Sequence, residues 1–311
     1  MQPKKTHVIL DVDAGIDDAV AIMLAVNSPS LSVDLISTCS GNVDANQVGE
    51  NVLNILNLIK RPEIPVVIGE TEPLKRPRMI LSVHGTDGMG DFSEKFPKHN
   101  LKPVEGRACE KMAEMLLKSQ DPMTIISVGP LTNLAKLVLE HPEVKPKIEK
   151  FVLCAGSIEK YAPGVLPYFG FNVMIDPEAC EEVLKSGVPI EVCPTDMGHF
   201  AYLDYFEVYQ TKNTNSMGQV LEMIYRKYRD RHIKNGIATH DSCAVAFVTN
   251  PEIFEKEKLH VHVGYYGENK TGVLRCEWEE PRNIVCATNI DIKKFKQLYF
   301  KALKRTKTLF D

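Results

Sequence analysis

The sequence predicts an α/β fold in which a central, mostly parallel sheet is flanked by helices and the ligand site lies at the carboxyl ends of the strands. Strand-like and helix-like segments alternate in a β-α-β-α-β order over residues 7–69, and this alternation favours a parallel sheet with helices on both faces. A strand, a glycine turn and a helix also follow one another twice, at residues 7–27 and 123–135. Open α/β sheets place their ligand sites at such strand-to-helix corners.

The first part of the chain predicts three strands and two helices. An apolar strand at residues 7–11 precedes a helix that runs to about Asn27. A second strand at residues 32–39 is followed by a helix with apolar positions at helical spacing, which Pro62 ends. A short buried strand at residues 65–69 completes this unit.

Residues 70–104 lose this periodicity and contain His84-Gly85 in a glycine-rich stretch. A long loop inside a compact domain is often functional, although a plain surface excursion is equally compatible with the sequence.

The second part of the chain resumes the alternation and ends with further strands and a basic helix. Helices are predicted at residues 108–117, 131–135, 220–232, 240–247 and 292–304, and strands at residues 123–128, 151–156, 188–193, 261–266, 272–277 and 283–287. In the helix at 220–232 we expect Tyr225, Arg226, Tyr228 and Arg229 to form a solvated face rather than a substrate contact.

Length and composition are those of an ordinary globular protein. The 311 residues are 44% hydrophobic and 25% charged, enough for a sizeable core. This length is compatible with one large domain or two smaller ones, and we predict a single domain over residues 1–311. The formal net charge of −4 offers no basic excess for phosphates, so nucleic acid is not an expected partner.

No apolar segment reaches the length of a signal core or a membrane span, so we expect a cytoplasmic protein that does not bind a membrane. The eight cysteines form no Cys-x-x-Cys pair. Reduced, buried thiols are therefore expected, rather than a zinc site or a disulfide framework.

Four aspartates gather at the first strand-to-helix corner. Asp11 and Asp13 end the first strand, and Asp17 and Asp18 fall in the first turn of the helix that follows. Crowded carboxylates raise each other's pKa and persist in a fold only when a cation or a shared proton compensates them. A cap at the helix start explains Asp17 or Asp18 alone, but not the other two. A hard divalent cation is the natural compensator.

The stretch from Asp11 to Asp18, Asp-Val-Asp-Ala-Gly-Ile-Asp-Asp, resembles the N-terminal aspartate signature of the inosine/uridine-preferring nucleoside hydrolases, with Ala14 where proline is commoner. The elements Phe171-Asn172 and Asp176-Pro-Glu-Ala, and the segment Thr239-His240-Asp241, are similar to further motifs of this family. The resemblance runs from about His7 to Phe247. It implies the family's fold, metal-dependent hydrolysis of the N-glycosidic bond of nucleosides to base and ribose, a place in nucleoside salvage, and a homodimer or homotetramer.

The resemblance also implies a calcium site and a set of site residues. The metal ligands carried over are Asp13, Asp18, Asp241 and the main-chain carbonyl of Val128. Asp13 is then the general base that activates a metal-bound water, and His240 is the candidate general acid for the leaving base. Contacts to the nucleoside are expected from Asp17, Asn42, His84 and Asn172.

The chain departs from the family pattern before Asn172. Family members usually place an asparagine eight residues, and a glutamate two residues, before the matching asparagine, and those positions here are Gly164 and Gly170. In similar enzymes these side chains hold the ribose 5′-hydroxyl. Two glycines offer no such contact unless a neighbour such as Glu159, Tyr161 or Tyr168 replaces it, so weak discrimination at the 5′ position is expected.

Two other functions are compatible with parts of the sequence. Asp11-Val12-Asp13 after a strand is also similar to the haloacid-dehalogenase-type phosphatases, although the Asp17-Asp18 pair fits that chemistry poorly. Because Gly164 and Gly170 lack the family's sugar-binding side chains, the sequence is also compatible with a ribose or nucleoside binder that does not catalyse or has altered specificity. The sequence does not identify the preferred base.

Overall fold

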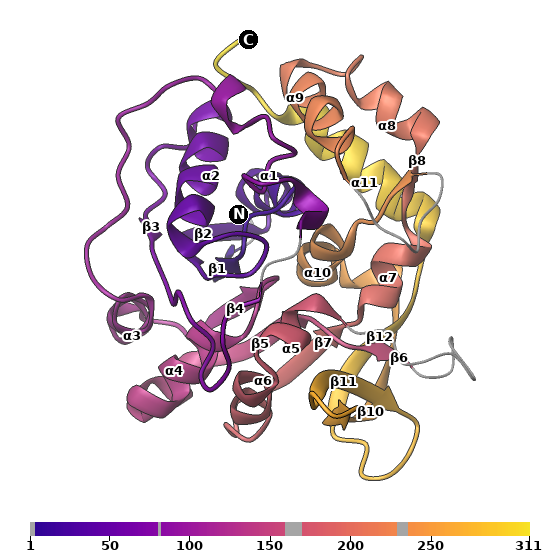
Figure 1. The fold of residues 1–311 in the computed structure, drawn as a ribbon. Helices are drawn as coiled ribbons and strands as arrows, with labels where there is room; N and C mark the ends of the chain where they lie inside the picture. Colours follow the sequence, from indigo (N-terminus) through magenta and orange to yellow (C-terminus); the bar gives the residue numbers. More distant parts are fainter. Residues whose placement is uncertain (1–3, 80–81, 159–169, 229–235) are drawn as a thin grey trace.

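The computed structural model describes residues 4–79, 82–158, 170–228 and 236–311 (Figure 1). Within them, one sheet of ten strands has the order β3-β2-β1-β4-β5-β7-β12-β10-β11-β6. Its strands are β1 Thr6–Val12, β2 Leu31–Thr38, β3 Val66–Val67, β4 Met123–Ser127, β5 Ile148–Cys154, β6 Ser157–Ile158, β7 Ile190–Cys193, β10 Phe254–Tyr266, β11 Thr271–Glu277 and β12 Ile284–Ile290. Two short strands, β8 (Leu203–Asp204) and β9 (Gly236–Ile237), pair separately.

The sheet is parallel except where β10 joins it. β10 runs antiparallel to both β11 and β12, whereas the other strand pairs of the sheet are parallel. The predicted α/β class with a mostly parallel central sheet is confirmed.

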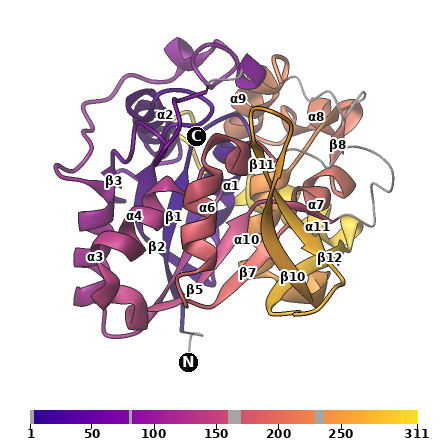
Figure 2. The ribbon, with the colours of Figure 1, turned by 60° about the horizontal axis from the view of Figure 1, so that its bottom comes forward.

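Helices cover both faces of this sheet. Figures 1 and 2 show α3, α4 and α6 on one face and α1, α10 and α11 on the other. The helices are α1 Asp18–Asn27, α2 Ala45–Leu58, α3 Ala108–Lys118, α4 Thr132–Glu140, α5 Phe171–Ile175, α6 Pro177–Leu184, α7 Thr195–Phe200, α8 Tyr205–Thr211, α9 Ser216–Tyr225, α10 His240–Thr249 and α11 Ile292–Arg305.

Two helices are embedded in the core rather than lying on its surface. Residues 18–26 of α1 are all buried, as are residues 241–247 of α10, and the two helices pack against each other. Helices that are apolar on all sides are buried on all sides. Their N-terminal turns, which carry Asp18 and Asp241, are therefore held together by the core itself.

The strand order changes direction at β1. From β1 the chain proceeds to β2 and β3 on one side, whereas β4, β5 and β7 follow on the other side. β1 pairs with both β2 and β4, so the connections leaving β1 and β4 diverge at their carboxyl ends. This divergence is the topological switch point at which open α/β sheets bind ligands.

Several local expectations were wrong. α9 begins at Ser216, where the Asn215 side chain accepts a hydrogen bond from the Gly218 amide, and ends at Tyr225, instead of spanning residues 220–232. Tyr225 and Tyr228 are buried rather than solvated. Arg226 is exposed and pairs with Glu222, while Arg229 lies outside the described residues.

Other differences concern element length. β10 starts at Phe254, seven residues before the predicted strand. The four charged residues at 255–258 are exposed and lack the apolar alternation that predicts a strand. The short elements β6, β8, β9, α7 and α8 were not predicted, since segments of two to seven residues carry too little periodicity. All eight cysteines are buried thiols, as predicted.

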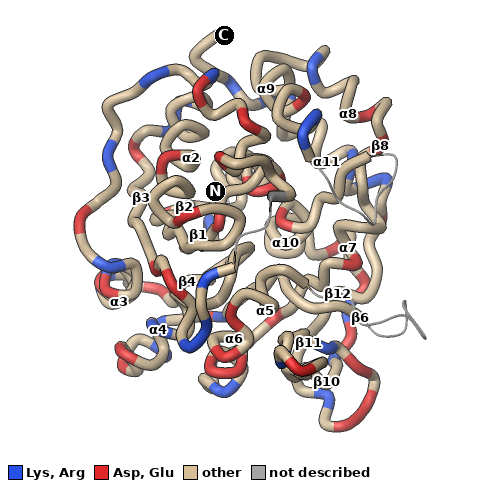
Figure 3. The backbone as a smooth tube through the Cα atoms, viewed as in Figure 1, with Lys and Arg blue, Asp and Glu red and all other residues tan. Residues whose placement is uncertain are grey.

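Charges of both signs are interspersed around the periphery, and acidic segments gather near the centre of the view in Figure 3. Among the described residues, no helix combines the length and the apolar character that crossing a bilayer requires.

Candidate active site

Three aspartates from two distant motifs converge at the switch point. Asp17 and Asp18 lie at the start of α1, and Asp241 lies in the first turn of α10. Each offers a carboxylate oxygen within 4.8 Å of the other two. Asp18 and Asp241 are buried and Asp17 is half-buried. Without a compensating charge, so many carboxylates cannot all be ionised in one buried place.

One oxygen of this cluster has no donor to satisfy it. Asp18 Oδ2 accepts a hydrogen bond from the Gly15 amide at 2.7 Å, but its buried Oδ1 has no hydrogen-bond donor among the described residues. Only a proton shared with Asp241 or a cation satisfies that oxygen. The arrangement therefore fits a bound cation, and carboxylate oxygens are the donors that calcium and magnesium prefer.

The acidities of these groups reflect the same crowding. Burial, and then the charges of Asp13 and Asp17, raise the pKa of Asp18 well above its ordinary value. Burial and the neighbouring Asp17, Asp18 and Asp13 raise the pKa of Asp241 in the same way. The metal-free cluster therefore binds protons more readily than isolated aspartates do, and a divalent cation would compete with those protons.

Asp13 lies beside this cluster in a fixed orientation. Its Oδ2 accepts a hydrogen bond from the backbone N–H of Asn42 at 3.0 Å. The turn that presents this amide passes so close that a Cβ on Gly41 would lie 2.1 Å from Asp13 Oδ2. Burial, with a further contribution from Asp17, raises the pKa of Asp13 to about 8.

Asp11 is at the same corner but serves the scaffold. Oδ1 accepts hydrogen bonds from Ser37 Oγ at 2.6 Å and Asn133 Nδ2 at 2.7 Å, and Oδ2 accepts one from Ser127 Oγ at 3.2 Å. Its donors come from β2, β4 and α4. Burial raises the pKa of Asp11 to about 6. Asp11 thus lies at the predicted corner, but hydrogen bonds occupy both of its oxygens.

Val128 and Asn172 contact each other. The Val128 carbonyl at the end of β4 accepts a hydrogen bond from Asn172 Nδ2 at 2.7 Å. The same amide nitrogen donates to the Cys154 carbonyl at 3.0 Å, so both of its hydrogens are used by the backbone. Asn172 retains Oδ1 as its remaining polar atom. A carbonyl oxygen has two lone pairs, and Val128 therefore keeps one acceptor position.

His240 is oriented by contacts with helix α7. Its Nδ1 lies 2.9 Å from the carbonyl oxygen of Thr195, so Nδ1 carries the proton and Nε2 faces away from that bond. The His199 ring packs edge-on against it, with 4.6 Å between centroids. Gly198 makes this approach possible, because a Cβ there would lie 2.4 Å from His240 Nδ1.

His84 brings the long loop to the acidic corner. The Ile16 amide donates to His84 Nδ1 at 3.0 Å, which places the ring proton on Nε2. Nδ1 is also 3.8 Å from Asp17 Oδ1, but it bears no proton to donate while it accepts from the amide. The Tyr228 ring meets His84 edge-on at 5.3 Å. The predicted loop residue is therefore adjacent to Asp17.

Two residues that position this loop were not singled out from the sequence. Asn51 of α2 donates to the Ala14 carbonyl at 3.2 Å and to the Asp87 carbonyl at 2.8 Å, which joins the acidic turn to the His84 loop. The Asp87 carboxylate in turn accepts three backbone amides within the loop. A buried Asn in a helix and an Asp followed by glycines were the available signals.

The departure from the family pattern is described in part. Gly164 lies outside the described residues, as do Glu159, Tyr161 and Tyr168. Gly170 is buried at the start of α5. Among the described residues, a Cβ on Gly170 would meet the Gly156 amide nitrogen, at an ordinary 3.5 Å. The described part of the chain therefore places no atom closer than ordinary van der Waals contact to a Cβ at this position.

Comparisons with known proteins place these features in context. Residues 8–297 match the sequence model of the family described as inosine-uridine preferring nucleoside hydrolase. The non-specific ribonucleoside hydrolase RihC of Escherichia fergusonii is 35% identical over 295 residues, which cover 93% of this chain and 95% of that protein. RihC of Escherichia coli O7:K1 is similar to the same extent.

Solved structures show the same architecture. The plant nucleoside hydrolase PpNRh1 superimposes with a TM-score of 0.86 at 25% identity, over 96% of this chain and 99% of that one. A purine-preferring ribonucleoside hydrolase from Gardnerella vaginalis does so with a TM-score of 0.85 at 24% identity, over 96% and 98%.

Proposed function

The chain belongs to the inosine-uridine preferring nucleoside hydrolase family, and from this premise we propose that it hydrolyses the N-glycosidic bond of ribonucleosides to free base and ribose. The observation that carries the proposal is the convergence of Asp17, Asp18 and Asp241 beside Asp13 at the switch point. These residues come from two of the three motifs on which the resemblance is densest.

We propose calcium as the resident ion, held by Asp13, Asp18, Asp241 and the Val128 carbonyl. The unsatisfied Asp18 Oδ1 supports a cation there, and the proximity of Asp17 adds a fourth carboxylate to the surroundings. A bound divalent ion supplies Lewis acidity, which lowers the pKa of a water and orients ribose hydroxyls.

Asp13 is the proposed general base. Because the Asn42 amide fixes Oδ2, the carboxylate is held in one orientation and its other oxygen is the one that accepts a proton from the attacking water. The pKa of Asp13, about 8 without a metal ion, would fall beside a bound dication, which would favour the ionised carboxylate that a general base requires.

His240 is the proposed acid for the departing base. With Nδ1 committed to the Thr195 carbonyl, only Nε2 can exchange a proton with the leaving group. An oxocarbenium-like transition state requires protonation or hydrogen bonding of the base on the side opposite the water.

We propose that Asp17, Asn42, His84 and Asn172 contact the nucleoside. Asp17 and Asn42 lie beside Asp13 and the cation position, so hydroxyls of the ribose are their natural partners. His84 lies next to Asp17, with 3.8 Å between its Nδ1 and Asp17 Oδ1, so the same part of the nucleoside can reach both side chains.

A panel of nucleosides with reducing-sugar detection tests the proposed function. The similarity to non-specific ribonucleoside hydrolases leads us to propose that both purine and pyrimidine nucleosides are cleaved. Asp13→Asn should abolish sugar release, while Asp121→Asn, at an exposed residue that pairs with Lys4, should not change it. Sugar release from none of the nucleosides, with binding by calorimetry, would favour a non-catalytic binder, and hydrolysis of an aryl phosphate would favour a phosphatase.

We further propose one domain over residues 1–311, a cytoplasmic role in nucleoside salvage, and a homo-oligomer. The exposed aromatic residues Tyr205, Phe206 and Tyr209 of α8 support self-association, since Phe206 is 70% exposed. Light scattering should show a dimer or tetramer, and Phe206→Ser should shift it toward the monomer if α8 forms the contact.

A further inference from the structure

The antiparallel part of the sheet carries a second group of ligand-type side chains. In the part of the chain that the structure describes, two groups of three His, Cys, Asp or Glu residues have donor atoms close enough for one ion. One is the acidic cluster described above. The other consists of His260 and His262 on β10 and Glu277 on β11, and we call it the hairpin triad.

The β-sheet geometry explains why these three side chains meet. His260 and His262 are two residues apart on β10, so their side chains leave the same face of the strand. In the antiparallel register, Glu277 lies directly opposite His260. Side chains of directly opposed residues share a face and lie within reach of each other. The triad is thus fixed by one strand pair.

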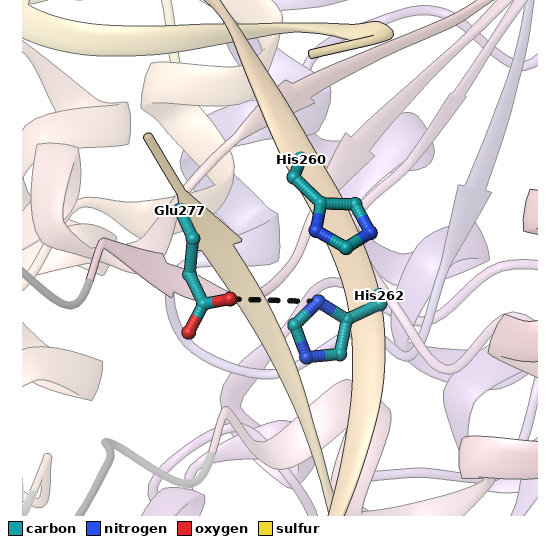
Figure 4. Close-up of side chains that lie close together, drawn as sticks. All are labelled: His260, His262 and Glu277. Atoms are coloured by element: carbon teal, nitrogen blue, oxygen red, sulfur yellow. Dashed lines mark ion pairs between the residues drawn. The ribbon is translucent and has the colours of Figure 1, made fainter. Parts of the chain in front are cut away.

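The side chains are oriented toward one another. Figure 4 shows the His262 ring pointing at the Glu277 carboxylate, with the His260 ring beside it. His262 Nδ1 is 3.8 Å from Glu277 Oε2, and the two imidazole centroids are 4.8 Å apart with a tilt of 34°. One donor atom of each residue lies within 4.8 Å of the others.

These distances are close to what a small metal ion requires. Donors bonded at about 2.1 Å in a tetrahedron are separated by about 3.4 Å. The pair His262 Nδ1 and Glu277 Oε2, at 3.8 Å, is already near that separation. One donor atom of half-buried His260 lies within 4.8 Å of both, a gap that a change of side-chain rotamer could close.

Arg275 orients the carboxylate of the triad. Arg275 Nη2 contacts Glu277 Oε1 at 2.5 Å, while Oε2 faces His262. A hydrogen bond to the outer oxygen orients a ligating carboxylate, as is common around metal sites. The guanidinium charge also repels a dication. We therefore expect micromolar rather than nanomolar affinity.

We propose that the hairpin triad binds a zinc-type transition-metal ion through two imidazoles and one carboxylate. Imidazole nitrogens select zinc, copper or nickel over calcium and magnesium, which prefer oxygen alone. The two sites of the protein are therefore expected to take different ions. A bound ion would cross-link β10 to β11 and stabilise this antiparallel ribbon.

The test is a calorimetric titration of the full chain with Zn²⁺ in a millimolar excess of Ca²⁺, which keeps the acidic cluster occupied. We expect one equivalent of Zn²⁺ to bind to the parent protein. His262→Ala should remove that equivalent, and Glu277→Gln should weaken it at least tenfold. His141→Ala, a histidine near Glu143 on another part of the surface, is the matched control and should bind like the parent.

Two further measurements keep the proposal falsifiable if His262→Ala does not fold. His260→Gln, which changes a half-buried residue, should also lose the equivalent. Zn²⁺ should raise the Tm of the parent by about 2 to 5 °C and leave that of the variants unchanged. Unchanged stoichiometry in both histidine variants, or loss of Zn²⁺ binding in Asp18→Asn instead, would overturn the proposal.

Discussion

The acidic cluster and the hairpin triad are built in opposite ways. The cluster joins Asp17 and Asp18 to Asp241, more than two hundred residues later in the chain, through two helices packed inside the core. The triad is local, since a single strand pair supplies all its members. The cluster offers only oxygen, and is mostly buried, whereas the triad offers nitrogen and oxygen on a partly exposed ribbon.

Because of this difference, the two sites depend on different interactions within the fold. Moving α10 relative to α1 separates the aspartates, so the acidic cluster depends on the packing of the whole core. The triad depends only on the register of β10 and β11, because a slip of one residue turns its side chains to the other face. Variants that change one site and leave the other intact test this difference.

The largest effect is expected from Asp13→Ala. This change removes the proposed base and one proposed metal ligand, so kcat for the best nucleoside should fall about a thousandfold or more. Steady-state assays with reducing-sugar detection measure it, with circular dichroism as the control for folding. Turnover within about tenfold of the parent would show that Asp13 is not the base.

Asp18→Asn is expected to separate the two metal sites. The change removes a carboxylate charge next to Asp241 and should weaken Ca²⁺ binding by about a hundredfold. Zn²⁺ binding at the hairpin triad should remain as in the parent. Calorimetric titrations with each ion measure both effects, and equal losses for both ions would mean that the sites are not independent.

Asp11→Ala should affect stability more than chemistry. It leaves the Ser37, Ser127 and Asn133 donors without their acceptor, and we expect the free energy of unfolding to fall by about 2 to 3 kcal/mol. Urea denaturation measures this loss. A Ca²⁺ affinity equal to that of the parent would support the assignment of Asp11 to the scaffold, and its loss would contradict it.

Calcium binding should strengthen as the pH rises from 6 to 8, by about tenfold or more. The raised pKa of Asp13, about 8, means that the metal-free site holds a proton which Ca²⁺ must displace. By the same linkage the metal-free native state binds protons more tightly than the unfolded chain, so its stability should decrease from pH 4 to pH 8. Melting curves in chelator and in Ca²⁺ test both signs, and a metal-free protein that gains stability over this range would contradict them.

The smallest effect concerns the 5′-hydroxyl of the ribose. With glycine at 164 and 170, removal of this hydroxyl should change kcat/KM less than about tenfold, measured with inosine and 5′-deoxyinosine. Gly170→Glu, at a position where the described residues leave a Cβ at ordinary contact distance, should increase the preference for the hydroxyl. A loss of a hundredfold or more in the parent protein would show that another group holds it.

The fold class and the acidic corner were predictable because their signals are strong. Buried parallel strands are long apolar runs, and an aspartate cluster is costly without a function. The role of Asp11 was not predicted, although a signal existed. Asp11, Ser37 and Ser127 occupy aligned positions on three adjacent strands, and this register becomes visible only when the strands are paired.

Other features depend on distances that no sequence pattern encodes. The contact of Gly198 with His240, and that of Gly41 with Asp13, arise from the way in which separate segments approach each other. The hairpin triad was also missed. His262 fell inside the predicted strand at 261–266 and His260 just before it, and Glu277 joins them only through the cross-strand register.

Because all eight thiols are buried, their reaction with thiol reagents can report local opening of the fold. Burial raises the pKa of Cys39 and Cys154 well above the ordinary value for cysteine, so a maleimide or a disulfide reagent meets almost no thiolate in the native state. Cys39 lies against the backbone that carries Asp13. The rate at which reagents label Cys39 therefore measures how often the backbone around Asp13 opens to solvent, without any added probe.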